Sequence, residues 1–407
     1  MTLTFHAANS WPPSTEEALA AAAKTGLLNE THTVDIKREL PAGDAANKEL
    51  AADIASFAID GGYIFIGVDE DHGAALAPVQ LDGLAERIEQ VARTRIDEPV
   101  NVTSASIASI TQPGRGYLVV RVPASPRAPH MASHRYWARG DKTKYPMSDS
   151  QVELLMAQRA AWAANAGDLL LEWMAQDPIA EKSRENGHLF VVASPVPPRE
   201  RFLLPVFTAP WLDPFKELLS ATKRAGPQFQ PDFPDSLSNF SRTPNGWAGS
   251  SYAVFVQRDG GRGREDGMLK VEISEDGVLR LMCGRATVDQ QHTPLDSTRL
   301  VFDELCLGLT ARMVSLAGRV SEKAGFLGSW DFGVGLTGLT STVSAVQWSR
   351  THWRPENFYP DDRYSATTRA DVTQIEASAG HVVEQLLGRL MRALSCDDFP
   401  DVKRHFA

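Results

Sequence analysis

The stretch ASFAIDGGYIFIGVDE, residues 55–70, decides the fold of the first part of this chain. It contains the end of an apolar helical segment, a glycine-rich turn at residues 60–62 and an apolar run over residues 63–68. Glycine adopts the positive φ that such a turn needs, and a short run that is apolar on both faces is typical of a central strand. The stretch therefore predicts a helix, a tight turn and a central strand in succession.

The segments on either side continue this alternation. Helices are predicted where apolar residues recur every three or four positions, over residues 14–24, 47–58, 81–95 and 151–163. Strands are predicted where polar and apolar residues alternate, near residues 33–37, 100–107, 116–123 and 136–139. Helices mixed with strands in this way predict one α+β domain over residues 1–163.

The rest of the chain predicts a second α+β domain whose type its residues do not identify. At about 150 residues per domain, 407 residues predict two or three domains, and the pattern favours two. Residues 164–187 are predicted to form a helical linker, and residues 188–407 the second domain. It is expected to contain strands near 189–192, 269–283 and 330–336, a surface loop over 227–249, a strand-like segment over 343–349, and long helices near 298–323 and 371–395. We expect it to sense a ligand or another protein.

The composition predicts a soluble protein of the cytoplasm. No apolar run approaches the roughly 18 residues that a membrane span requires, and no secretory signal is visible. Cys283, Cys306 and Cys396 are widely spaced and lack histidines at zinc-like spacing, which indicates reduced, buried thiols. The net charge of -10 argues against a protein that coats nucleic acid without specificity, because phosphate binding relies on Lys and Arg.

One window departs from this acidic balance. Between residues 115 and 144 the only acid is Asp141, whereas the bases are Arg115, Arg121, Arg127, Arg135, Arg139, Lys142 and Lys144. Charge alone favours a solvated surface. Aromatic residues lie among the bases, namely Tyr117, Tyr136, Trp137 and Tyr145. Arginine binds phosphates and aromatic rings stack on unpaired bases, although Tyr117 and Trp137 fit the core of a strand equally well.

Three blocks of the sequence resemble the Schlafen family. ETHTVDIK, residues 30–37, is similar to the family's signature of a Glu followed five residues later by Glu-Phe-Lys, with Asp35 and Ile36 in place of Glu and Phe. Residues 55–70 are similar to the family's AFANTDGGYVLIGVDD, and residues 136–149 to its ending YYIRVGSST…PMS. Three blocks in the right order are far more specific than any single short motif.

The resemblance implies an AlbA-like domain that binds RNA or DNA, and in Schlafen ribonucleases a three-carboxylate site that cleaves transfer or ribosomal RNA with a divalent metal. Carried over residue by residue, the acids fall on Glu30, Asp35 and Glu70, with Asp69 as a further ligand beside Glu70. Hard oxygen ligands suit Mg²⁺ or Mn²⁺. Lys37 would stabilise charge that develops on the phosphate. The phosphate contacts are predicted at Arg121, Arg127, Arg135, Arg139, Lys142 and Lys144.

Residue geometry sets a condition on this site. In a continuous strand, positions 30 and 35 would face opposite sides, so a turn near Thr31 must bring Glu30 and Asp35 together. The alternative is that Glu30 and Asp35 only cap the chain or form ion pairs with Lys37 and Arg38, and that residues 69–71 form a polar hairpin turn.

Two functions follow from these observations. The first is a metal-dependent endoribonuclease that acts on structured RNA such as transfer RNA, in a stress or phage-defence response. The alternative is a noncatalytic DNA-binding transcriptional regulator whose second domain senses a signal. AlbA-like folds often pair, so a C₂ homodimer is expected in either case.

Overall fold

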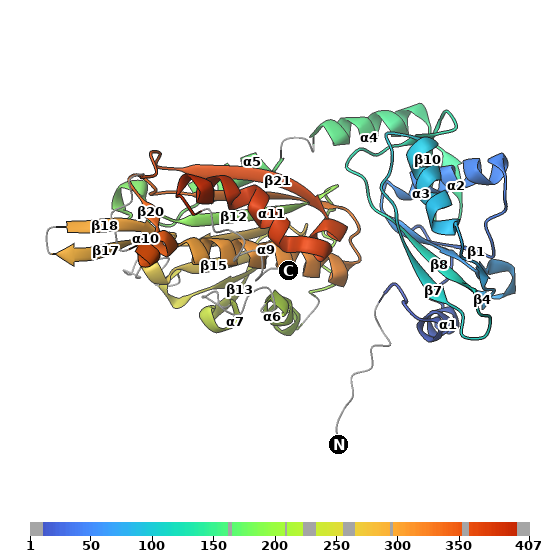
Figure 1. Ribbon diagram of the computed structural model, residues 1–407, viewed down its shortest axis with the longest axis horizontal. Helices are drawn as coiled ribbons and strands as arrows, with labels where there is room; N and C mark the ends of the chain where they lie inside the picture. Colours follow the sequence, from blue (N-terminus) through green and yellow to red (C-terminus); the bar gives the residue numbers. More distant parts are fainter. Residues whose placement is uncertain are drawn as a thin grey trace, which may run out of the picture. The chain divides into compact units, whose positions relative to one another are not determined.

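The computed structural model describes residues 11–161, 165–207, 210–222, 233–254, 265–293, 296–351 and 358–396. The chain divides into two compact units, Met1–Trp162 and Ala163–Ala407, beside the predicted boundary after residue 163. The first unit is the blue and cyan part of Figure 1, which ends with the green helix α4 (Asp149–Ala161).

The first unit mixes helices and strands as predicted. Its other helical elements are α1 (Glu16–Lys24), α2 (Asp44–Phe57), α3 (Leu84–Thr94) and the 3-10 turn η1 (Glu70–His72). Its strands are β1 (Val34–Lys37), β2 (Gly62–Ile66), β3 (Val68–Asp69), β4 (Ala75–Leu76), β5 (Val79–Gln80), β6 (Ile96–Asp97), β7 (Thr103–Ala108), β8 (Arg115–Val122), β9 (Met131–Ala132), β10 (Arg135–Arg139) and β11 (Lys144–Pro146).

The main sheet of this unit has the order β1-β2-β8-β5, with β7 also paired to β8. β2 is central and buried throughout, as its apolar run predicts, and it pairs with β1 in parallel so that Val34 lies opposite Tyr63. One face of the sheet packs on α2 and α3 through residues such as Ile54, Ile64 and Val91. A second sheet has the order β11-β10-β9-β6, and α2 contacts its strands β9, β10 and β11.

The turn of the deciding stretch has the predicted glycine geometry. Gly61 adopts a φ of 79°, and its amide donates to the Phe57 carbonyl at 2.6 Å, which ends α2. Gly62 follows at a point of close approach: a Cβ there would lie 2.3 Å from Cδ1 of Phe57 and 2.8 Å from the Thr33 carbonyl oxygen. The turn therefore joins α2 to β2 and places the end of α2 close to β1.

The second unit is also α+β. Its helical elements are α5 (Asn165–Ala175), η3 (Glu181–Ser183), α6 (Leu212–Ala221), α7 (Phe233–Ser236), η5 (Glu265–Gly267), α9 (Asp303–Ala324), α10 (Ala345–Thr351) and α11 (Val372–Ala393). Its strands are β12 (Leu189–Val196), β13 (Asn239–Thr243), β14 (Gly246–Ser250), β15 (Leu269–Ser274), β16 (Leu279–Cys283), β17 (Thr287–Thr293), β18 (Asp296–Val301), β19 (Ser329–Leu336), β20 (Val343–Ser344) and β21 (Tyr364–Asp371).

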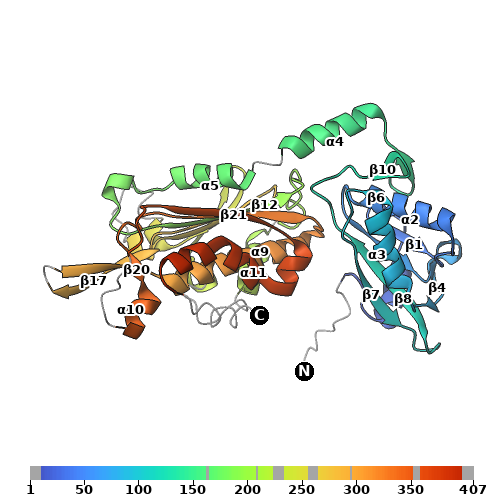
Figure 2. The same ribbon diagram turned by 45° about the horizontal axis from the view of Figure 1, so that its top comes forward.

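A seven-stranded sheet, β13-β14-β15-β16-β12-β19-β21, is the centre of the second unit. The long helices α9 and α11 cover one face, and α5 lies on the other face (Figure 2). Alternate residues of β12 separate the two sides: Val191 belongs to the large core with α9 and α11, whereas Phe190 packs with Trp173 of α5. The fold class is thus α+β in both units, as predicted.

Four expectations for the second unit are corrected. Residues 164–187 are not a linker, because α5 packs on β12 and β19 and so belongs to the sheet. The predicted surface loop is described from residue 233 onward, where β13 and β14 form a hairpin that joins the main sheet through β15. Tertiary pairing also makes residues 296–301 a strand before α9, and most of residues 343–349 a helix after β20.

Several further side chains are as the sequence predicts or add to it. Cys283, Cys306 and Cys396 are buried, and none of the three is in a disulfide bond. The ring of His188 is buried between two acids, with Nδ1 2.7 Å from Asp177 Oδ2 and Nε2 2.5 Å from Glu265 Oε1. None of the helices in the described part of the chain combines the length and apolar character that a membrane crossing requires.

Candidate functional site

A tight turn at the start of β1 brings Glu30 next to Asp35. The Thr31 amide donates to the Val34 carbonyl at 3.0 Å, the Val34 amide donates to the Thr31 carbonyl at 3.4 Å, and the Thr33 amide donates to Thr31 Oγ1 at 3.2 Å. The chain thus reverses between positions 31 and 34 and does not continue as a strand. This is the turn that the sequence requires if the two acids are to meet.

Glu30 lies among the other two predicted acids. Its pKa is raised to about 7, first by burial and then by the charge of Asp35, with which it shares a hydrogen bond, and by Glu70 in the same way. Glu70 arrives from a different part of the chain, because it opens η1 directly after β3. The structure therefore brings Glu30, Asp35 and Glu70 together, and their mutual repulsion favours a shared proton.

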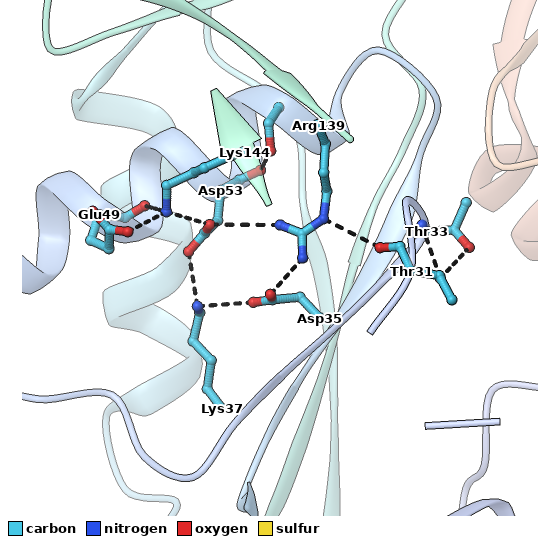
Figure 3. Close-up of polar contacts among 9 residues, drawn as sticks. Thr31, Thr33, Asp35, Lys37, Glu49, Asp53, Arg139 and Lys144 are labelled. Carbon is cyan, nitrogen blue, oxygen red and sulfur yellow. Dashed lines mark hydrogen bonds and ion pairs between the residues drawn. The ribbon is translucent and has the colours of Figure 1, made fainter. Parts of the chain in front are cut away.

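Asp35 is also held by two cations (Figure 3). It is buried, with an exposed fraction of 5%; Lys37 Nζ lies 2.9 Å from its Oδ2 and Arg139 Nη2 lies 2.7 Å from its Oδ1. Burial works to raise the pKa of Asp35, but the charges of Lys37 and Arg139 outweigh it and hold the pKa below its usual range. Asp35 therefore stays ionised beside Glu30.

A fourth acid, Asp53 of α2, completes this arrangement. Its carboxylate is 2% exposed and lies 3.0 Å from Lys37 Nζ and 2.6 Å from Lys144 Nζ. Burial lowers the pKa of Lys37, but Asp53 and then Asp35 outweigh this effect and raise it, so that its ammonium stays charged. Lys144 in turn pairs with Glu49. We call these six residues the acid–base cluster: Asp35, Lys37, Glu49, Asp53, Arg139 and Lys144.

The sequence reasoning missed Asp53, although it left a signal. The buried face of α2 includes Leu50, Ile54 and Phe57, and position 53 lies on the same face at helical spacing. An acid on the apolar face of a helix requires a buried cation as its partner. That requirement, applied to the sequence, predicts that basic residues elsewhere in the domain fold back onto α2.

Arg139 links three segments of the first unit. Its side chain is 4% exposed, its Nε donates to the Thr31 carbonyl at 3.3 Å, and its guanidinium lies 4.4 Å from the centroid of the Phe57 ring. It therefore ties β10 to the Thr31 turn and to the end of α2. At this distance the guanidinium makes a cation–π contact with the Phe57 ring.

Carboxylates of the acid–base cluster pair with both Arg139 and Lys144, so phosphate contact by either side chain would have to compete with an acid, and it stays a prediction. Among the other predicted bases, Arg127, Arg135 and Lys142 are exposed, and Arg121 is partly buried. Their contact with nucleic acid stays a prediction.

The aromatic residues of this basic window also divide into buried and exposed side chains. Tyr117 is buried, and its hydroxyl donates to Glu16 Oε1 at 2.6 Å. The Trp137 indole packs on the core and donates to the Ala132 carbonyl at 2.9 Å. Tyr145, by contrast, is 40% exposed and is available for stacking.

Asp69 is occupied within its own turn. Its Oδ1 accepts from the Asp71 amide at 3.1 Å, and its Oδ2 lies 3.0 Å from His72 Nδ1 and 3.2 Å from Arg38 Nη1. Within the described residues, no group of three or more His, Cys, Asp or Glu side chains is arranged so that it could hold a metal ion. Metal binding by Glu30, Asp35, Glu70 and Asp69 therefore stays a prediction.

Comparison with known proteins agrees with the sequence blocks. A family model described as Schlafen, AlbA_2 matches residues 30–148, a range that contains the three carboxylates, the acid–base cluster and the basic window. No curated protein matches the chain.

Proposed function

Residues 30–148 are a Schlafen AlbA_2 domain, and from this we infer that the first unit binds nucleic acid and cleaves structured RNA, such as transfer RNA, with Mg²⁺ or Mn²⁺. The observation that carries the proposal is the meeting of Glu30, Asp35 and Glu70 beside the charged Lys37. Such a reaction would suit a stress or phage-defence response.

The donor set suits a hard divalent cation. Burial, and then the charges of Asp35 and Glu70, raise the pKa of Glu30, and a bound cation would relieve the repulsion among the three carboxylates. Glu30, Asp35 and Glu70 would hold the cation, after Asp35 gives up one of its contacts with Lys37 and Arg139. When bound, a divalent metal polarises the scissile phosphate.

The protein's own side chains have separate tasks in this proposal. Lys37, held in place by Asp35 and Asp53, would donate to a non-bridging phosphate oxygen as negative charge develops there. The exposed Arg127, Arg135 and Lys142 would bind the RNA backbone, and Tyr145 would stack on an unpaired base. Arg139 would keep Asp35 and the Thr31 turn in register and would not touch the RNA.

The test is cleavage of transfer RNA by the full chain with Mn²⁺. Glu30→Gln and Glu70→Gln are expected to lower the cleavage rate by about 100-fold or more, the usual scale for loss of an essential carboxyl group. Glu89→Gln, an exposed glutamate on α3, is the matched control and should leave the rate unchanged. Cleavage that survives in both site variants, or that persists in excess chelator, would reject the nuclease proposal.

The alternative is noncatalytic DNA binding by a transcriptional regulator. One observation favours it: each carboxylate oxygen of Asp35 contacts a basic side chain, Lys37 or Arg139, as expected if the role of the cluster is structural. In this case duplex DNA binds without metal-dependent cutting. For either nucleic acid, Lys142→Ala should lower the slope of log affinity against log salt by about 1, whereas Lys144→Ala should act on stability. An equal slope in Lys142→Ala and wild type would exclude Lys142 from the interface.

A further inference from the structure

A cavity of about 1040 Å³ lies in the second unit, on the outer face of the main sheet. Strict alternation along the strands creates its floor. In β15, Leu269 and Val271 point into the core, whereas Lys270, Glu272 and Ser274 line the cavity. Its volume is at the upper end of the roughly 300–1,000 Å³ typical of small-molecule sites.

Helix α5 forms one wall of this cavity and is firmly anchored. Trp173 is 3% exposed, and its indole nitrogen donates to the Leu281 carbonyl at 2.8 Å. Because α5 covers β12 and β19 but not β13 to β15, the sheet stays uncovered by this helix beside Trp173. The edge of the helix and the β13–β14 hairpin therefore enclose a hollow over the uncovered strands.

Two cations converge on Trp173 in this hollow. Lys270 Nζ lies 5.2 Å and the Arg280 guanidinium carbon 5.9 Å from the ring centroid. Lys270 pairs with Glu272 at 2.5 Å, which neutralises one of the two charges. Arg280 lies directly opposite Glu272 in the sheet, but among the described residues no carboxylate lies within ion-pair distance of it. The floor of the cavity therefore carries a net positive charge, that of Arg280.

The rim supplies mostly neutral hydrogen-bonding groups, together with Glu172 and Arg242, whose charges are of opposite sign. Ser238, Asn239, Ser241, Thr243, Asn245 and Ser250 all line the cavity. Hydroxyl and amide groups around a lining of net positive charge suit a polar anion better than a lipid or an apolar peptide. Lys270 and Arg280 cover the Trp173 ring. The ring therefore holds these two side chains in place and is not free to stack on a ligand.

We propose that this cavity binds a small hydroxyl-rich anion of the size of a nucleoside monophosphate, with a phosphate or carboxylate group on Arg280 and Lys270. Binding there would give the second unit the ligand-sensing role that its sequence leaves unassigned. The inference uses residues of the second unit alone, so it stands or falls independently of RNA cleavage by the first unit.

The test is isothermal titration of the full chain with two matched probe pairs: AMP against adenosine, and glucuronate against glucose. We expect one of the two anions to bind and its neutral partner to bind at least tenfold more weakly. Whether AMP or glucuronate binds then shows whether the cavity recognises a phosphate or a carboxylate. Arg280→Met should weaken the binding by about tenfold or more, the scale of one charge-assisted hydrogen bond. Glu30→Gln should leave it unchanged.

Arg285→Met is the matched control, because Arg285 also covers an aromatic ring, at 4.8 Å from the Phe302 centroid, but does not line the cavity. It should bind the anion like wild type. If Arg280→Met does not fold, Lys270→Met replaces it, with the same expected loss. The proposal is overturned if neither anion binds at about 10 mM, if the neutral probes bind equally, or if the cavity variant that folds binds like wild type.

Discussion

The charge of Asp53 is predicted to hold the first unit together, and Asp53→Asn removes that charge with almost no change of shape. In the wild type, Asp53 is 2% exposed and contacts Lys37 and Lys144 at 3.0 and 2.6 Å, with Arg139 Nη1 at 3.9 Å (Figure 3). The substitution leaves three largely buried cations with one carboxylate fewer. An unbalanced buried charge is costly because the interior screens it poorly.

The magnitude follows from the partners that remain. Removal of one member of a buried ion pair costs about 3–5 kcal/mol. Lys37 keeps Asp35, and Lys144 keeps the exposed Glu49, so neither ammonium is left alone. We therefore expect a loss at the lower end, about 3 kcal/mol, which corresponds to a change of roughly 150-fold in the ratio of folded to unfolded first unit.

Hydrogen exchange measured by mass spectrometry separates the two units and is the suitable assay. Asp53→Asn should lower the protection of the β1 and β2 amides by about 3 kcal/mol and leave β12 and β19 unchanged. Asp82→Asn, the same substitution at an exposed site of the same unit, should stay within about 0.5 kcal/mol of wild type.

A double variant tests the cause of this loss. Lys144→Met removes a cation that depends on Asp53, so Asp53→Asn with Lys144→Met should lose less stability than the sum of the single variants. A loss below about 1 kcal/mol in Asp53→Asn, or simple additivity in the double variant, would refute the view that Asp53 balances buried positive charge.

Two further predictions concern the turn and the second unit. Gly62→Ala should destabilise the first unit by about 1–3 kcal/mol, because its Cβ would lie 2.3 Å from Phe57, whereas Gly140→Ala, whose Cβ meets a neighbour at 3.5 Å, should be nearly neutral; equal urea midpoints in the two variants would contradict this. The pKa of His188 is raised, since its acidic partners outweigh the effect of burial. Its stabilising contribution is thus present below about pH 6.5 and lost as pH rises through the raised folded pKa. Urea unfolding between pH 5 and 9 should show this loss in wild type and not in His188→Gln, and parallel pH profiles would contradict it.

Local sequence signals determined much of the first unit. The Asp60-Gly61-Gly62 turn, the apolar run after it and the helical spacing before it were sufficient to predict α2 and β2, because each depends on neighbours in the chain. The order of the three sequence blocks was sufficient to predict the Schlafen AlbA_2 domain. The condition that the chain must turn near Thr31 also followed from the two-residue period of a strand, and the structure contains that turn.

Long-range pairing was beyond the reach of such signals. β13 is short and mostly polar, and β14 is short and contains two glycines, so the intrinsic preference of both is for a loop. Pairing with each other and with β15 makes them strands of the main sheet. Likewise, the sequence of α5 predicts a helical linker, and its packing on β12 and β19 makes it part of the second unit. Tertiary contacts override local propensity in both cases.

The sequence by itself determined which acids and bases the first unit possesses and which family it resembles. Only the tertiary structure decided which of them meet: Arg139 binds Asp35 across 104 positions, and Lys144 binds Asp53 across 91. The physical reason is that the sequence gives the residue type but not its burial: a lysine on an exposed strand and a lysine in the core are written in the same way. Burial alone decides whether a cation remains free for phosphate or must neutralise an acid.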